Sequence, residues 1–191
     1  MIKILPIVIL VIAILLGLLL RSLIAPIFLI LTVVLSYLST LGITVLLFQT
    51  FGSEGGVNFI LPFLLFVFLI ALGEDYNILV MSRIREEWPH SGDHKARTTA
   101  VVRAVGATGG TVTSAGVILA GGFIMFGVAG IIGNSPQLTE IGFALAIGIF
   151  LDTFVVRTLL VPSIVQLLGN FTWWPSALGH EGKPSTPKVS A

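Results

Sequence analysis

Five long apolar segments, each able to cross a lipid bilayer as a helix, constrain this chain more than any other feature. They run from about 4 to 20, 23 to 48, 57 to 82, 101 to 128 and 138 to 168. A helix needs roughly 20 apolar residues to cross a hydrocarbon core of about 30 Å. Only 10% of the 191 residues are charged, against about 25% in soluble domains. The sequence therefore predicts an all-α fold: a polytopic membrane bundle of five transmembrane helices.

The two ends of the chain are expected to differ. The first apolar segment lacks a small-residue cleavage site and is followed by Arg21, so it is interpreted as a retained span and not as a signal peptide. Residues 1–175 are predicted to form one transmembrane domain. Residues 176–191 are rich in Gly, Pro, Ser and Lys, without an apolar period, and are predicted to form a disordered cytoplasmic tail.

The distribution of Lys and Arg predicts the orientation. The segments 21–22 and 83–103 and the tail are basic, whereas 51–56 and 130–137 carry no Lys or Arg. By the positive-inside rule the basic segments face the cytoplasm. The chain is therefore predicted to be a multi-pass protein of the cell membrane, with an extracytoplasmic N-terminus and a cytoplasmic C-terminus. Three tryptophans are expected to anchor the cytoplasmic interface: Trp88, Trp173 and Trp174.

Several function classes are excluded by composition. A net charge of +1 without a basic stripe argues against a nucleic-acid partner. The absence of cysteine removes thiolate metal sites and cysteine nucleophiles. His90, Asp93 and His94 superficially suggest a metal site, but a solvated cytoplasmic loop is the favoured interpretation. We expect no metal, no cofactor and no enzymatic activity.

The strongest local signal is the run Gly73-Glu74-Asp75-Tyr76-Asn77 inside the third apolar segment. Asp75 lies eight residues before Arg83, which places it roughly 12 Å inside the cytoplasmic boundary. Ionisable residues at that depth are costly and usually mark ion or proton paths. Asp75 is predicted to carry protons, with Tyr76 as a hydroxyl donor to its charged form. The alternative is a structural polar residue satisfied by neighbouring helices.

Glu74 lies about 100° around the helix from Asp75. Two adjacent acids at one depth repel each other when both are charged, so at least one should be neutral. Glu74 is interpreted either as a second proton carrier or as a partner of Arg157.

The fourth apolar segment carries small residues and hydroxyls. Gly106, Gly110 and Ser114 recur every four residues, which predicts a seam for close helix packing. Thr113 and Ser114 reach the depth of Asp75 and are candidates for bonding its carboxylate or lining a water path. The alternative is that these hydroxyls bond the carbonyls of their own helix.

The fifth apolar segment contains Asp152 and Arg157. Five residues apart, they are not expected to share one face of an α-helix cleanly. We expect Arg157 to reach another helix or to extend toward the cytoplasm. A structural or gating ion network is favoured over direct proton carriage. Pro162 is expected to kink the helix near its inner end.

The run from Ala71 to Glu87 resembles the Asp-Tyr signature of the MMPL family, within the RND superfamily of transporters. Further matches are Arg21-Ser-Leu-Ile-Ala-Pro26, Thr113-Ser-Ala-Gly116, Leu151-Asp-Thr-Phe-Val-Val-Arg157 and Trp173-Trp-Pro175. They occur in the order expected for the last five helices of an MMPL transporter. The resemblance covers about residues 4–175.

The resemblance implies a proton-motive-force-driven exporter of lipids or other hydrophobic compounds. It implies that Asp75 and Tyr76 match half of a two-part proton relay. The other Asp-Tyr pair of the family lies in the first half of the molecule, so the expected partners are an N-terminal half or another copy of this chain. Membrane lipids, a hydrophobic substrate and protons are the other expected partners. A non-transporting module similar to the sterol-sensing domains, binding lipid or a partner protein, is the alternative.

Overall fold

The computed structural model describes residues 4–51, 58–89 and 94–175, and these ranges are helical throughout, apart from short turns. The long helices are α1 (Ile4–Leu20), α2 (Ile24–Phe51), α3 (Leu61–Glu87), α4 (His94–Ile132) and α5 (Pro136–Leu151). A π-helix, η1 (Asp152–Leu160), continues α5 into α6 (Val161–Leu168) and a 3-10 turn, η2 (Gly169–Trp173). The predicted all-α bundle is confirmed.

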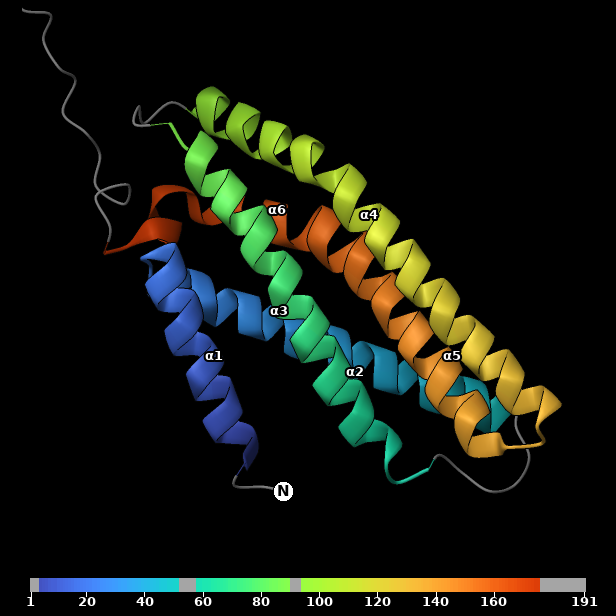
Figure 1. The fold of residues 1–191 in the computed structure, drawn as a ribbon. Helices are drawn as coiled ribbons and strands as arrows, with labels where there is room; N and C mark the ends of the chain where they lie inside the picture. The colour runs from blue at the N-terminus through green and yellow to red at the C-terminus, as the bar shows by residue number, and fades with distance from the viewer. Residues whose placement is uncertain (1–3, 52–57, 90–93, 176–191) are drawn as a thin grey trace, which may run out of the picture.

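The helices run alternately up and down, with α1 at one side of the bundle and α4 and α5 packed side by side at the other (Figure 1). Four described stretches are long and apolar enough to span a membrane: Ile24–Thr50, Leu61–Glu87, His94–Ile132 and Pro136–Trp173. Helix α1, with 17 residues, is at the short end of the range for a span. Large apolar side chains such as Leu18, Ile118 and Leu167 are exposed, which suits a surface solvated by lipid.

The helices extend further at their basic ends than the apolar segments. Helix α3 continues to Glu87 and α4 begins at His94, so part of the segment expected to be a loop is helical. Arg83 stabilises this extension by pairing with Glu86 and Glu87, three and four residues ahead, at 2.9 Å each. Residues 90–93, with His90 and Asp93, lie outside the described ranges, as do residues 52–57 and the predicted tail.

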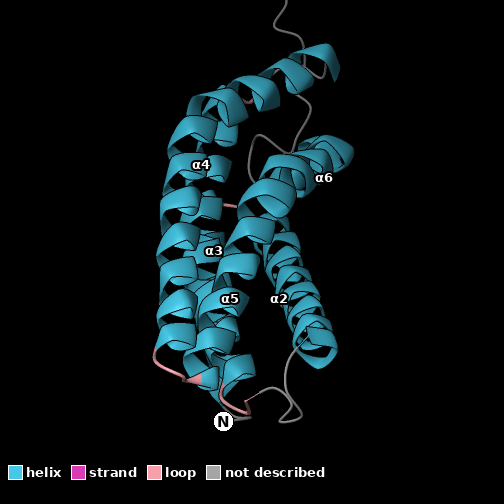
Figure 2. Cartoon of the chain, turned by 90° about the vertical axis from the view of Figure 1, so that its right-hand side faces the viewer, coloured by secondary structure: helices cyan, strands magenta, loops and turns pink. Residues whose placement is uncertain are grey.

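Helix α4 closely approaches α5 and η1 at positions where it carries glycine, and Figure 2 shows α4 and α5 side by side. A Cβ on Gly116 would lie 2.5 Å from Thr153 Oγ1, and one on Gly142 would meet the backbone of Gly127. Only hydrogen fits at such positions, which is why small residues favour close helix packing in membranes.

The predicted packing seam of Gly106 and Gly110 meets no described helix of this chain, so it stays a prediction for a helix outside the described residues. Both residues are exposed, and no described atom lies within 4 Å of a Cβ built on either. The helix interface uses a different face of α4, which carries Gly116, Gly127 and Gly130. A four-residue repeat of small residues allows close packing, but it does not decide which face the neighbouring helix covers.

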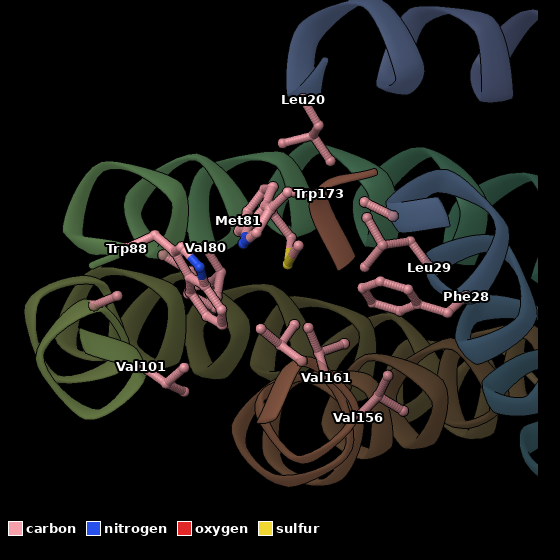
Figure 3. Packing of buried hydrophobic residues seen from close by; sticks show 14 of the residues in the cluster. Leu20, Phe28, Leu29, Val80, Met81, Trp88, Val101, Val156, Val161 and Trp173 are labelled. Carbon is pink, nitrogen blue, oxygen red and sulfur yellow. The ribbon is translucent and has the colours of Figure 1, made fainter. Parts of the chain in front are cut away.

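A hydrophobic core fills the basic end of the bundle, where side chains of α1, α2, α3, α4 and α6 meet (Figure 3). Trp88 and Trp173 lie in it, 3% and 0% exposed, with ring centroids 5.7 Å apart. The Trp88 indole donates a hydrogen bond to Asn170 Oδ1 at 3.2 Å. These two rings pack on each other inside the bundle, whereas Trp174 is exposed. The interfacial role expected of the three tryptophans stays a prediction.

Ser22, in the connection between α1 and α2, joins the start of α2 to the end of the chain's described part. Its hydroxyl accepts bonds from the backbone N–H groups of Ile24 and Ala25, which caps α2, and donates to the Thr172 carbonyl at 2.6 Å. The Leu23 N–H also donates to the Trp174 carbonyl at 3.0 Å. Two short motifs about 150 residues apart in the sequence are thus joined in the fold.

Candidate functional site

Polar side chains gather at mid-length of α3, where it faces η1. Residue 74 is the midpoint of the 27-residue helix α3, about 20 Å from either end. Glu74 and Asn77 lie one turn apart on this helix and are 7% and 1% exposed. Asp152 and Arg157 of η1 are 3% and 5% exposed. We refer to Glu74, Tyr76, Asn77, Asp152 and Arg157 as the α3–η1 cluster.

Asp152 and Arg157 form a buried ion pair in which an Nη2 hydrogen of Arg157 is donated to Asp152 Oδ2. The expectation that these residues would not share a face is wrong, because the segment that holds them is a π-helix. Each turn of a π-helix bonds five residues apart, as the Val161 N–H does to the Val156 carbonyl. Residues five apart therefore stack on one side. The direct contact between Asp152 and Arg157 is the one that the predicted ion network requires.

Pro162 provides a physical reason for the change of register. It has no N–H to donate to the carbonyl four residues earlier, and its ring crowds that carbonyl. The π-helix occupies the turns immediately before Pro162, and a regular helix, α6, begins at Val161. The chain changes direction between α5 and α6 (Figure 2), which agrees with the predicted kink.

Arg157 also joins η1 to α3. Its Nη2 donates to the Leu72 carbonyl at 3.0 Å, and its guanidinium carbon lies 4.5 Å from the centre of the Tyr76 ring. A guanidinium over an aromatic face is attracted by the ring quadrupole, more strongly when both are desolvated. The Nε of Arg157 has no hydrogen-bond partner among the described residues. Tyr76 thus contacts the cation of the cluster, a role that the sequence did not indicate.

Glu74 lies on the side of α3 that faces α1 and α2. Its Oε2 has no hydrogen-bond partner among the described residues. The carboxyl group borders a cavity of about 10 Å³ that is otherwise lined by apolar side chains of α1, α2 and α3: Ile9, Ile12, Ile30, Val33, Val34 and Ile70. Glu74 also interacts electrostatically with Asp152, Arg157 and Asp75. Glu74 is therefore part of the buried charge cluster, without a direct bond to Arg157.

Asn77 ends the run that the sequence analysis identified, but no role was predicted for it. Both polar atoms of its buried side-chain amide lack hydrogen-bond partners among the described residues. A buried polar group without a partner costs free energy, so its presence at mid-length of a membrane helix requires a reason. Its spacing of three residues from Glu74 was the available signal, because such residues share a helix face.

The described structure has no hydrogen bond between Asp75 and Ser114. Both are exposed, and Thr113 is half-buried. The Ser114 hydroxyl donates to the Thr111 carbonyl of its own helix at 3.1 Å, and its single proton is then not available to Asp75. The local alternative weighed for this hydroxyl is the one that the structure adopts. Asp75 is exposed on the outside of the described helices, whereas Glu74 is buried.

Comparison with known proteins matches the MMPL family model to residues 1–187. This chain belongs to the MMPL family. It is 47% identical over 184 residues to the probable transport protein MmpL12 of Mycobacterium tuberculosis, covering 96% of this chain and 15% of the relative. It is 43% identical over 188 residues to the apo-petrobactin exporter of Bacillus anthracis, covering 98% of this chain and 24% of the relative.

This MMPL chain thus spans less than a quarter of the length of these relatives. A third relative, the putative membrane protein ActII-3 of Streptomyces coelicolor, is 38% identical over 188 residues, which cover 98% of this chain and 25% of the relative. The family assignment and the apolar helices together establish a multi-pass membrane protein.

Proposed function

We propose that this chain is part of a proton-motive-force-driven membrane transporter that exports lipids or other hydrophobic compounds. The observation that carries the proposal is the α3–η1 cluster, with ionisable side chains buried at mid-length of a membrane helix. Such residues are expensive in a bilayer and are typical of proton paths in pumps and transporters. Relatives named as a transport protein and an exporter support the same function.

Asp75 is the proposed proton carrier, with Tyr76 beside it in the relay and Glu74, Thr113 and Ser114 as further members. Because Asp75 is exposed on the described helices, the proposal requires another helix to shelter it from lipid. The exposed glycines Gly106 and Gly110 offer a surface on which such a helix can pack closely. An N-terminal half or a second copy of this chain is the proposed partner.

Replacing Asp75 by Asn tests the relay. In vesicles that hold the assembled transporter, an imposed pH gradient is expected to drive proton uptake, followed with a trapped pH-sensitive dye. Asp75→Asn should abolish that uptake without loss of the assembled protein, because an amide cannot carry the proton. Glu86→Gln, an exposed acid at the basic end of α3, is the matched control and should retain it. Uptake that persists in Asp75→Asn would refute the assignment.

The proposed orientation places the N-terminus outside and the C-terminus in the cytoplasm. Basic side chains gather at one end of the bundle: Arg85 Nη1 donates to the Leu19 carbonyl at 3.3 Å, and the Arg97 guanidinium lies beside Gly169. In this cysteine-free chain, Ser53→Cys should react with an impermeant thiol reagent from outside, and Ser91→Cys only after permeabilisation. The reverse pattern would invert the topology.

An apolar cavity of about 310 Å³ supports a second candidate function, a non-transporting module that binds lipid. Side chains of α2, α4 and α5 line it: Ile43, Ala120, Ile124, Phe143, Ala146, Ile147, Phe150 and Leu151. A photoreactive sterol that labels this cavity, together with loss of labelling in Ala120→Trp and absence of proton uptake in the assembled protein, would favour this function over transport.

A further inference from the structure

The α3–η1 cluster contains two buried carboxyl groups and one buried guanidinium. Glu74 and Asp152 are the acids and Arg157 is the cation, each less than a tenth exposed. If both acids were ionised, the cluster would carry one uncompensated negative charge in a low-dielectric interior. Unpaired buried charges are strongly disfavoured, and a buried acid takes up a proton instead.

We propose that Glu74 and Asp152 share one proton, and that Arg157 pairs with whichever acid is ionised. This proposal rests on the proposed proton-driven function and adds a second proton-binding site to it. In the structure Arg157 pairs with Asp152, so the proton resides on Glu74, whose Oε2 has no hydrogen-bond partner.

Among the described neighbours of Glu74, Arg157 is the cation that can compensate a negative charge on its carboxylate. The residues of α1 and α2 that line its cavity are all apolar. On its own helix the ionisable neighbours are Asp75, which is exposed, and Tyr76, whose ring lies under Arg157. From η1 the charged residues that act on Glu74 are Asp152 and Arg157.

The second state follows from charge balance. The proton leaves the Glu74 carboxyl and binds the Asp152 carboxylate; Arg157 leaves Asp152 and pairs with the Glu74 carboxylate. No charge is gained or lost in the cluster. The Arg157 bond to the Leu72 carbonyl and its contact with the Tyr76 ring keep the guanidinium at α3 during the exchange.

Element η1 is suited to such an exchange. Thr158 Oγ1 donates to the Thr153 carbonyl at 3.0 Å, five residues back, and π-helical turns are less regular than α-helical ones and frequent at functional sites. Because Gly116 of α4 packs directly on Thr153, movement of η1 is transmitted to α4. Asp75, next to Glu74 in the sequence, is the group whose charge biases the exchange.

Infrared spectroscopy of the purified 191-residue chain in lipid nanodiscs at neutral pH tests the shared proton. The native chain should show the C=O stretch of one protonated buried carboxyl group, and comparison with Asp75→Asn removes any contribution from that exposed acid. Glu74→Gln should remove the band, because Asp152 is then fully paired. Asp152→Asn should also remove it, since Arg157 then pairs with ionised Glu74.

Arg157→Gln should double the band, because both acids must then be neutral. Glu140→Gln is the control, because Glu140 is half-buried and accepts a bond from the Asn58 N–H far from the cluster; it should leave the band unchanged. Absence of the band in the native chain overturns the proposal, as does a band that persists in Asp152→Asn or Glu74→Gln. Failure of Glu74→Gln to fold also counts against it, because glutamine imitates the neutral acid.

This measurement requires no transport activity. If the band behaves as expected while Asp75→Asn transports normally, the shared proton stands and the transport relay fails. If the band is absent while Asp75→Asn abolishes uptake, the relay stands and the shared proton fails.

Discussion

Two adjacent acids on α3 have opposite surroundings. Glu74 is 7% exposed and lies on the side of α3 that α1 and α2 cover, whereas Asp75 is exposed on the outside of the described helices. A rotation of about 100° between successive residues accounts for the difference. Within the cluster, the buried Asp152 carboxylate is paired with Arg157 of the same chain. Asp75 on α3, like Gly106 and Gly110 on α4, is exposed on the described helices.

The same contrast separates the two sets of small residues on α4. Gly116 packs against η1 and Gly127 against α5 with no room for a methyl group, whereas no described atom lies within 4 Å of a Cβ on Gly106 or Gly110. The inner set fixes how the helices of this chain pack. The exposed glycines, Gly106 and Gly110, belong to a face of α4 that no described helix covers at these positions.

Arg157→Leu is expected to have the largest effect on stability. It leaves Asp152 buried without its cation, which typically costs about 3–5 kcal/mol. Unfolding of the chain in detergent micelles by added SDS, followed by circular dichroism, measures the change. The double variant Asp152→Leu with Arg157→Leu should recover most of the loss, because no unpaired charge remains. A single variant as stable as the native chain would show that the cluster does not hold α3 and η1 together.

Gly142→Ala is expected to cost about 1–3 kcal/mol, because the added methyl group overlaps the Gly127 backbone and must separate α4 from α5. The same SDS titration measures it. An unchanged midpoint would mean that the two helices tolerate a wider separation than the structure shows.

Gly110→Ala is the matched variant on the outer face and is expected to act in the opposite direction. Alanine is preferred over glycine within helices by roughly 0.5–1 kcal/mol, and no described atom opposes its Cβ. The isolated chain should therefore be slightly stabilised in the SDS titration. A loss similar to that of Gly142→Ala would show that Gly110 is packed after all.

Asp75→Asn is expected to change the stability of the isolated chain by less than about 0.5 kcal/mol, as is usual for exposed positions. Its effect should appear in proton uptake by the assembled protein and not in the unfolding of this chain. A large destabilisation of the isolated chain would place Asp75 within the buried network and remove the contrast with Glu74.

The sequence by itself determined the membrane class and the all-α fold. Long apolar segments leave no alternative to helices in lipid, since every backbone N–H and C=O must be bonded within the segment. It also predicted that Glu74 and Asp75 lie near mid-membrane, because depth along a helix follows from counting residues. The order of the motifs was enough to indicate the family.

Tertiary structure alone decided which acid is buried. Helical periodicity separates Glu74 from Asp75 by angle, but only the positions of α1, α2 and η1 determine which of them faces the interior. The Asp152–Arg157 pair depended on a π-helix that the five-residue spacing did not reveal. The glycine repeat on α4 likewise identified faces that permit close packing, and the docking of α5 selected one of them. In each case local geometry sets the options, and contacts between distant segments choose among them.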